Sequence, residues 1–277
     1  MARDVPAASR FVVTDAEREV ADLLPIEVAA DVARATVAAV PFWFHTFALN
    51  SAAGIYTPGA ARDHRYRVRL LPSDCAGMWV LDVGTFDGFY AFLAEYRGAR
   101  RVVAVDNEQY RLWVKSRWGI DLDGGAGFRA IHQLLDSSVE YRRMDAFALG
   151  DFGECFDLIF CCGILHRVED PLGLLRVLRS IAADGATVLI ETYGLPPEDR
   201  NGPAIRVSEP GEVYERDEFV YWGFGEQGLE RLARIAGFHG VQQLETVTVD
   251  GHPPDHRTPH RLSPPPGRRA HDFFTTR

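Results

Sequence analysis

The chain has 277 residues and a formal net charge of −9, from 30 basic and 39 acidic side chains. This balance argues against a broad electrostatic grip on nucleic acid, because neutralising phosphates requires a basic face. No apolar run reaches the roughly 20 residues that span a bilayer, and the first residues lack the apolar stretch of a secretory signal. Four cysteines without CxxC spacing indicate neither a disulfide scaffold nor a zinc ribbon, so we predict a cytoplasmic protein.

Residues 1–75 predict a helical and aromatic cap. Residues 15–40 have the pattern of one or two helices, with Pro25 in the first turn of the second. Pro41 should end that helix, because the residue before a proline is pushed out of the α region. Residues 42–75 are aromatic, then turn-rich, then arginine-rich. We therefore expect a cap over residues 1–75 and a core over 76–277.

From residue 78 onward, apolar runs alternate with helical patterns. Strands are predicted at 78–83, 102–105, 156–162 and 187–191. Helices are predicted over 89–96, 171–183 and 226–236. A last strand over 241–249 should pair with one over 269–276, and the proline-rich segment between them should be irregular. Strands that alternate with helices and end in a hairpin predict a three-layer α/β fold with a mostly parallel sheet.

The sharpest signal is the segment 80–88, where the first predicted strand of the core ends. Glycines at 84 and 88 let the backbone pass close to a ligand where a strand turns into a helix. Asp106 ends the next strand about 20 residues later, the spacing at which a carboxylate accepts hydrogen bonds from ribose hydroxyls. Phe86 stands where a GxGxxG loop has its middle glycine, which a pyrophosphate needs for backbone approach. A nucleoside without phosphates therefore fits this loop better than NAD.

These residues resemble a known family. The chain resembles class I S-adenosylmethionine-dependent methyltransferases over roughly residues 78–249. The likeness is carried, in this order, by Asp82-x-Gly84-x-x-x-Gly88, Asp106, Asp145 and Phe156–Phe160. The chain also resembles the wobble-uridine tRNA methyltransferase-like group, which includes carboxymethyl- and methoxy-uridine enzymes. The segments that carry this finer likeness are Phe44-His45-Thr46, Tyr56–Gly59, Gly163–Leu165 and Asp170–Leu172. The resemblance implies a Rossmann-like, seven-stranded sheet and S-adenosyl-L-methionine as cofactor.

The resemblance also implies a cofactor site. The loop Gly84-Thr85-Phe86, with Gly88, would line the methionine and ribose portions, and Asp82 would face the methionine amino group. Asp106 would hold the ribose hydroxyls, and Asn107 would flank the adenine. The edge of the adenine would be contacted by Asp145 and Ala146, and the sulfonium would lie over Cys162 and Gly163. An Asx turn is the alternative for Asp145.

Three residues are the main candidates for the acceptor side: His166, His45 and Arg167. Relatives commonly have Tyr-His or His-His where this chain has His166-Arg167. A general base helps when the acceptor is a hydroxyl, and its preferred pKa near working pH favours histidine. His166 follows a strand, where it could equally be structural, and His45 could belong to an aromatic plug; His64 of the cap is a further candidate. Arg167 could pair with an acceptor carboxylate or phosphate.

Three functions are compatible with these patterns: a small-molecule methyltransferase, a tRNA wobble-uridine methyltransferase, and a non-enzymatic binding module. Arginine clusters at 62–69 and 97–101 could touch phosphates, but the acidic remainder argues against a broad RNA footprint. We therefore predict methyl transfer to a small molecule of natural-product metabolism, with tRNA as the alternative partner and no membrane. No metal site is expected, because prolines interrupt the helix that would align His252, His256 and His260.

Overall fold

The computed structural model describes residues 11–200, 202–213, 217–244, 246–249 and 255–264. Five parallel strands form the centre of its main sheet: β3 (Trp79–Val83), β4 (Arg101–Asp106), β5 (Glu140–Arg143), β6 (Phe156–Cys162) and β7 (Ala182–Tyr193). The predicted strands at 78–83, 102–105, 156–162 and 187–191 are thereby confirmed. Because these strands are parallel, their carboxyl ends meet at one edge of the sheet, which is where open α/β sheets bind ligands.

Antiparallel strands complete the sheet beyond β7. They are β10 (Gly240–Gln243), β11 (Val247–Val249) and β12 (Asp255–Ser263). The full order is β10-β12-β7-β6-β3-β4-β5, and β11 also pairs with β12. The expected mostly parallel, seven-stranded path with an antiparallel end is confirmed, with β11 as an additional short strand.

The proline-rich segment corrects one expectation, because β12 is a regular strand that contains Pro259. Pro259 pairs with Glu191 of β7, while on its other side β10 pairs only from His260 and β11 only up to Arg257. The proline therefore lies opposite the break between two short strands, where one ladder partner is missing and a lost N–H is tolerated. The predicted partner strand over 269–276 lies outside the described residues.

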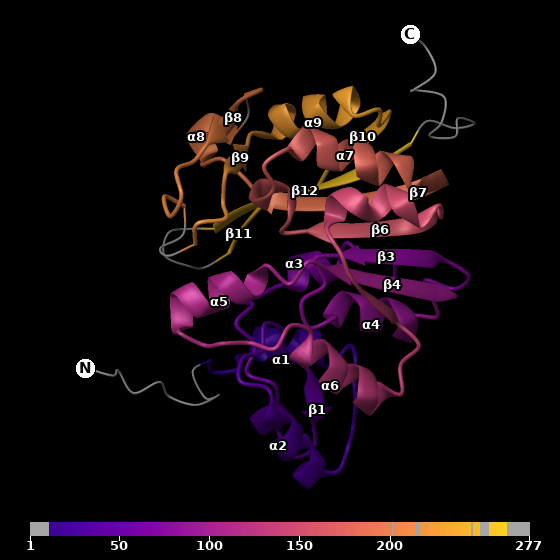
Figure 1. Ribbon diagram of the computed structural model, residues 1–277, viewed down its shortest axis with the longest axis vertical. Helices are drawn as coiled ribbons and strands as arrows, with labels where there is room; N and C mark the ends of the chain where they lie inside the picture. Colours follow the sequence, from indigo (N-terminus) through magenta and orange to yellow (C-terminus); the bar gives the residue numbers. More distant parts are fainter. Residues whose placement is uncertain (1–10, 201, 214–216, 245, 250–254, 265–277) are drawn as a thin grey trace.

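Helices cover both faces of the sheet and make three layers. Alternate strand residues such as Val80 and Leu81 face opposite ways into two separate apolar cores. The first core contains α4 (Phe89–Tyr96), α6 (Ala126–Leu135) and the N-terminal segment. The second contains η1 (Ala146–Phe152), α7 (Pro171–Ser180) and α9 (Glu226–Ile235). Figure 1 shows α7 and α9 toward the top of the view and the N-terminal elements toward the bottom.

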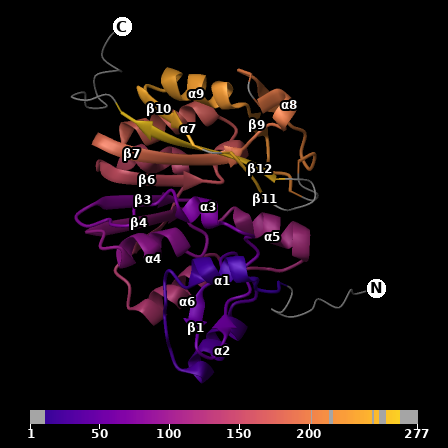
Figure 2. The same cartoon turned by 180° about the vertical axis from the view of Figure 1, so that it is seen from behind.

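The N-terminal segment, residues 11–75, contributes five short elements on the α4 side: α1 (Asp15–Ala21), α2 (Ala30–Ala39), β1 (Ala48–Asn50), β2 (Ile55–Tyr56) and α3 (Arg65–Val68). Figure 2 shows the first three grouped beside α6. We expected Pro25 in the first turn of α2, but it lies before that helix and pairs in an isolated bridge with Ala48. Pro41 does follow the end of α2, whose last cap residue, Val40, is extended.

Further elements connect these layers: α5 (Tyr110–Trp118), η2 (Leu165–Arg167), α8 (Pro197–Arg200), β8 (Ile205–Val207) and β9 (Trp222–Phe224). β8 and β9 form a separate antiparallel pair between β7 and α9 in the chain. None of the helices in the described ranges is long and apolar enough to cross a membrane.

Candidate active site

The loop between β3 and α4 turns sharply through left-handed backbone. Gly84 and Gly88 have φ values of 79° and 87°. A Cβ on Gly84 would lie 2.2 Å from Ile164 Cδ1, and one on Gly88 would lie 2.6 Å from the rings of Phe92 and Phe128. Both positions therefore require glycine for conformation and for space.

Phe86 lies between these glycines and has a positive φ of 52°, which is rare for an aromatic residue. Its ring is stacked between Phe44, at a centroid distance of 4.6 Å, and Tyr110 of α5, at 3.8 Å. Its amide donates to Asp106 Oδ2 over 2.9 Å. The stack and this hydrogen bond fix the loop across the ends of β3 and β4.

Two buried carboxylates lie within the last two residues of these strands. Asp106 accepts the amides of Phe86 and Glu108, and burial raises its pKa to about 6. Asp82 accepts the Thr85 hydroxyl over 2.7 Å, and burial raises its pKa to about 7. Across the described ranges, neither carboxylate forms an ion pair. Both therefore retain acceptor capacity for a cationic or hydroxyl-bearing ligand.

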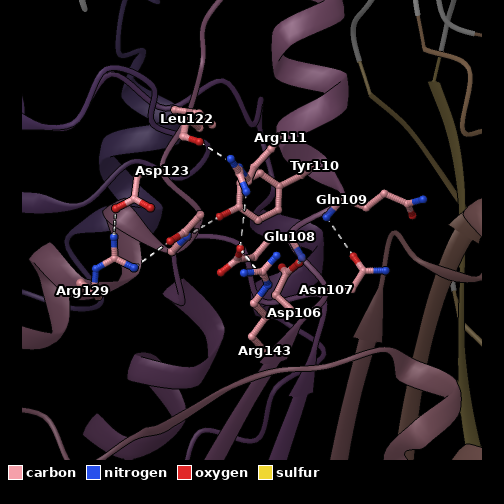
Figure 3. A network of polar contacts seen from close by, with 12 residues as sticks. Asp106, Asn107, Glu108, Gln109, Tyr110, Arg111, Leu122, Asp123, Arg129 and Arg143 are labelled. Atoms are coloured by element: carbon pink, nitrogen blue, oxygen red, sulfur yellow. Dashed lines mark hydrogen bonds and ion pairs between the residues drawn. The ribbon is translucent and has the colours of Figure 1, made fainter.

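A polar network anchors the chain that follows Asp106 (Figure 3). Glu108 has a positive φ of 59°, and its carboxylate pairs with Arg143 at 3.2 Å. The Tyr110 hydroxyl accepts the Gly125 amide over 2.8 Å, and Arg111 donates to the carbonyl of Leu122. The network joins α5 to the segment before α6, and so holds Asp106 in place.

A cavity of about 450 Å³ lies over the ends of β3, β4 and β6. Most of the residues predicted for the site line it: His45, Asp82, Gly84, Phe86, Asp106, Asn107, Asp145, Ala146, Cys162 and Arg167. Asp145 also accepts the amide of Phe147 and caps η1, so the Asx-turn alternative holds alongside its place in the wall. The structure thus brings together residues from six separate parts of the chain.

Three predicted residues do not line this cavity. Thr85 donates its hydroxyl to Asp82, and Gly88 packs against Phe92 and Phe128. His166 is completely buried; its Nδ1 lies 3.2 Å from the Thr192 hydroxyl and accepts the Tyr193 amide. Burial, with the nearby charge of Arg167, lowers the pKa of His166 well below its usual value, so the imidazole is neutral at pH 7.

His45 is the predicted histidine that reaches the cavity wall. Its ring lies 5.7 Å from that of His64, whose Nδ1 is 2.7 Å from the Tyr90 hydroxyl. Burial lowers the pKa of His45 well below its usual value and that of His64 to about 3. Both imidazoles are therefore neutral at physiological pH, and a neutral imidazole keeps one nitrogen as a proton acceptor.

At the basic end of the cavity, the sequence indicated Arg167 but not Arg67 or Arg257. Arg67 of α3 and Arg257 of β12 line it, and both pair with the fully buried Glu191 of β7, at 2.7 and 3.3 Å. Arg167 pairs with the buried Asp217 at 2.8 Å. The only sequence signal for Arg67 was its place in an arginine-rich stretch, because its carboxylate partner lies far away in the chain.

The fold and the cavity define a class of protein: S-adenosylmethionine-dependent methyltransferases bind their cofactor over such strand ends, on such a glycine-bearing loop. The match to the methyltransferase domain family covers residues 58–243, and the chain belongs to this family.

Curated relatives include tRNA U34 carboxymethyltransferases. The protein of Campylobacter hominis is 30% identical over 126 residues, 46% of this chain and 40% of that protein. That of Campylobacter jejuni is 25% identical, over 62% and 53% of the two chains. This chain thus spans about half the length of the curated relatives it matches.

Among solved structures, the N-terminal domain of EvdMO1 with SAH bound has a similar fold. Its TM-score is 0.59 at 15% identity, over 87% of this chain and 99% of that chain. The likeness confirms the Rossmann-like methyltransferase fold.

Proposed function

We propose that this protein transfers a methyl group from S-adenosylmethionine to a small-molecule acceptor of natural-product metabolism, in the cytoplasm. The observation that carries the proposal is the set of buried ion pairs at the basic end of the cavity. Its walls are the ion pairs of Arg67 and Arg257 with Glu191, and of Arg167 with Asp217. Buried walls of this kind suit a ligand that is itself enclosed.

The residues of the cavity fit S-adenosylmethionine. Asp106 would accept the ribose hydroxyls, and Asp82 would face the ammonium group, since each is buried and lacks a cationic partner among the residues described. Arg67 Nη2 lies 3.2 Å from the position of a Cβ on Gly163, at the end of β6. A carboxylate and a guanidinium on the same wall match the two charged groups of an amino acid. We therefore assign Arg67 to the methionine carboxylate.

The adenine end is assigned to Asn107, Asp145 and Ala146, with Phe86 and Tyr110 closing the site above them. The Asn107 side chain accepts the amide of Gln109, and the Asp145 side chain accepts the amide of Phe147. These hydrogen bonds fix the two side chains. This end needs no charge, because adenine is neutral. Cys162, whose pKa burial raises well above its usual value, would remain a neutral thiol beneath the sulfonium.

When bound, the cofactor supplies an activated methyl group, so the protein mainly has to position the nucleophile and exclude water. For a hydroxyl acceptor, the transferred proton becomes strongly acidic as the C–O bond forms. The neutral imidazole of His45 can therefore take that proton despite its low pKa. Arg167, held by Asp217, would orient an acidic group of the acceptor. His166 lies behind the wall, and we assign it no proton transfer.

A tRNA acceptor is the second candidate, because the curated relatives act on tRNA U34 according to their names. The arginine clusters offer it limited support. Arg62 pairs with Glu17, Arg65 with Asp63, and Arg101 with Glu140. The carboxylate beside each of these three guanidinium groups offsets its positive charge, so the three groups attract phosphate less strongly.

Three measurements on the whole chain test this proposal. Calorimetry should show SAH binding, and a titration with bulk tRNA at ~100 mM salt should show none. Purified protein with S-adenosylmethionine should form SAH with a small-molecule extract and not with the tRNA fraction. Binding of tRNA that weakens steeply with salt would favour the second candidate, whereas absent SAH binding would favour a non-enzymatic module.

A further inference from the structure

Asp87 is a buried carboxylate at the end of the cofactor loop that the proposed chemistry does not use. It is 3% exposed and is not part of the cavity wall. Its Oδ2 accepts two backbone amides from the N-terminal segment, that of Phe44 over 2.6 Å and that of His45 over 3.0 Å. One oxygen atom thus joins two regions that are more than 40 residues apart in the sequence.

This carboxylate is costly to bury. Desolvation raises its pKa to about 7, the charge of Asp106 adds to the increase, and the two amides lower it. In the part of the chain that the structure describes, no cation pairs with it. A buried carboxyl group without a counter-charge is tolerated only when hydrogen bonds offset the loss of hydration, and here the amides of Phe44 and His45 supply them. The two amides are therefore the reason for this acid at this position.

The opposite side of the same backbone is held as well. The carbonyls of Trp43 and Phe44 accept the amides of Ala60 and Ala61, over 3.0 and 2.7 Å. The carbonyl of His45 accepts the Thr57 hydroxyl over 2.8 Å. Residues 43–45 therefore run as a bridge between segment 57–61 and the cofactor loop, and Asp87 is the hydrogen-bond anchor at the loop end.

This anchoring decides where two side chains lie. Phe44 stacks on Phe86, the residue just before Asp87, with ring planes only 18° apart. His45 presents its ring to the cavity beside Tyr90, at a centroid distance of 5.4 Å. Without the two hydrogen bonds, only the carbonyl side of residues 43–45 would be held, and both rings could move.

We propose that Asp87 is a positioning residue, which locks the Phe44–His45 backbone to the cofactor loop and thereby sets the acceptor wall of the cavity. The proposal rests on the role assigned to His45 above. It implies that the loop that holds the cofactor and the wall that faces the acceptor move as one unit.

Gly127 of α6 offers an independent way to disturb the anchor. A Cβ at this position would lie 2.4 Å from Asp87 Oδ1 and 2.9 Å from its Cγ. Gly127→Ala should therefore displace the carboxylate without removing it. The substitution places no strain on the helix itself, where alanine is favoured over glycine.

The test compares Asp87→Ala, Asp87→Asn and Gly127→Ala with the wild type. Asparagine keeps an oxygen that can accept both amides, whereas alanine keeps none. Asp170→Ala is the matched control, because the exposed Asp170 also accepts one backbone amide, that of Gly173, at the start of α7.

The first readout is amide hydrogen exchange at Phe44 and His45 in the SAH complex, followed by NMR. We expect exchange at least about tenfold faster in Asp87→Ala and Gly127→Ala, with Asp87→Asn and Asp170→Ala close to the wild type. Unchanged exchange in Asp87→Ala would overturn the proposal.

The second readout is kcat/KM for an acceptor found in the extract assay, which should fall about tenfold or more in Asp87→Ala, with the KM for S-adenosylmethionine within about threefold. Rescue by Asp87→Asn supports the positioning role; equal losses in both variants overturn it. If no acceptor is found, amide exchange alone decides on Asp87, while SAH binding separately decides on the proposed function.

Discussion

The two ends of the cavity differ in whether their buried carboxylates are paired with cations. At the end that we propose for the cofactor, Asp82 and Asp106 are buried with hydroxyl and amide partners only, and their pKa values are raised. At the basic end, Arg67 and Arg257 share Glu191, and Arg167 pairs with Asp217. Among the described residues, Asp82 and Asp106 have no cationic partner, whereas Glu191 and Asp217 each pair with arginine.

This difference has an energetic meaning. Removing one partner of a buried ion pair lowers the free energy of unfolding by several kcal/mol, because the other charge remains buried without a counter-charge. A buried carboxylate without a cation is already penalised, and a ligand that brings positive charge or hydroxyl donors relieves the penalty. Loss of the buried carboxylates Glu191 or Asp217 at the basic end should therefore act mainly on folding, and loss of Asp82 or Asp106 mainly on binding.

The largest effect is expected for Glu191→Ala, which removes the carboxylate shared by two guanidinium groups. We expect the free energy of unfolding to fall by about 3–5 kcal/mol, measured by urea denaturation of the cofactor-free protein. Glu191→Gln, which keeps one acceptor oxygen, should lose less. The matched control is Glu140→Ala, whose partly exposed carboxylate pairs with Arg101 and Arg142, and it should cost about 1 kcal/mol or less. Equal losses of unfolding free energy at the two positions would show that Glu191 contributes no more than a partly exposed ion pair.

Asp106→Ala should act next most strongly, and on binding. Each hydrogen bond to a charged group contributes about 1.5–3 kcal/mol, so SAH affinity should fall roughly 10- to 100-fold. Asp106→Asn should show an intermediate loss, because it keeps one oxygen. Calorimetry with SAH measures both. Unchanged affinity in Asp106→Ala would show that the ribose is held elsewhere.

The smallest effect concerns pH. The pKa of Asp82 is about 7 in the cofactor-free protein, and an ammonium group favours the ionised form, so binding lowers this pKa and releases a proton below pH 7. SAH affinity should therefore weaken as the pH falls from 7 to 6, by at most about tenfold. Calorimetry in two buffers with different heats of ionisation detects the released proton.

Asp82→Asn should remove most of this pH dependence and leave a change of about twofold between pH 7 and 6, which comes from Asp106, whose pKa is about 6. Methylthioadenosine, which lacks the amino-acid group, serves as the ligand control and should bind equally well at pH 7 and 6.5. A full pH dependence with methylthioadenosine would assign the proton to another group than Asp82.

The central strands could be predicted from the sequence because their signal is local. The apolar runs ending at Val83 and Cys162 each define a buried strand within a few neighbouring residues. β12 could not be predicted in the same way. Pro259 argues against a strand when its neighbours in sequence are considered alone, and only the break between β10 and β11 explains why it is tolerated.

The same contrast holds for the site. Gly84 and Asp106 belong to a motif with fixed spacing, so the sequence already indicated the cofactor end. Arg67, Glu191 and Arg257 form a cluster only after α3, β7 and β12 have been brought together, and no local pattern joins them. For His166, the place after a strand suggested the cavity, whereas its ring is fully buried beside Thr192 and does not line the cavity.

The place of β12 has a consequence for synthesis on the ribosome. β7 pairs with β6 on one side and with β12 on the other, although β12 ends 70 residues after β7. While residues 194–254 are being made, the nascent chain therefore carries β7 with an open edge, which is the kind of surface that recruits foreign strands. Arg257 arrives with β12, so the strand that closes the sheet also completes the cavity wall. A chain stopped before it would have neither a protected edge nor a finished pocket.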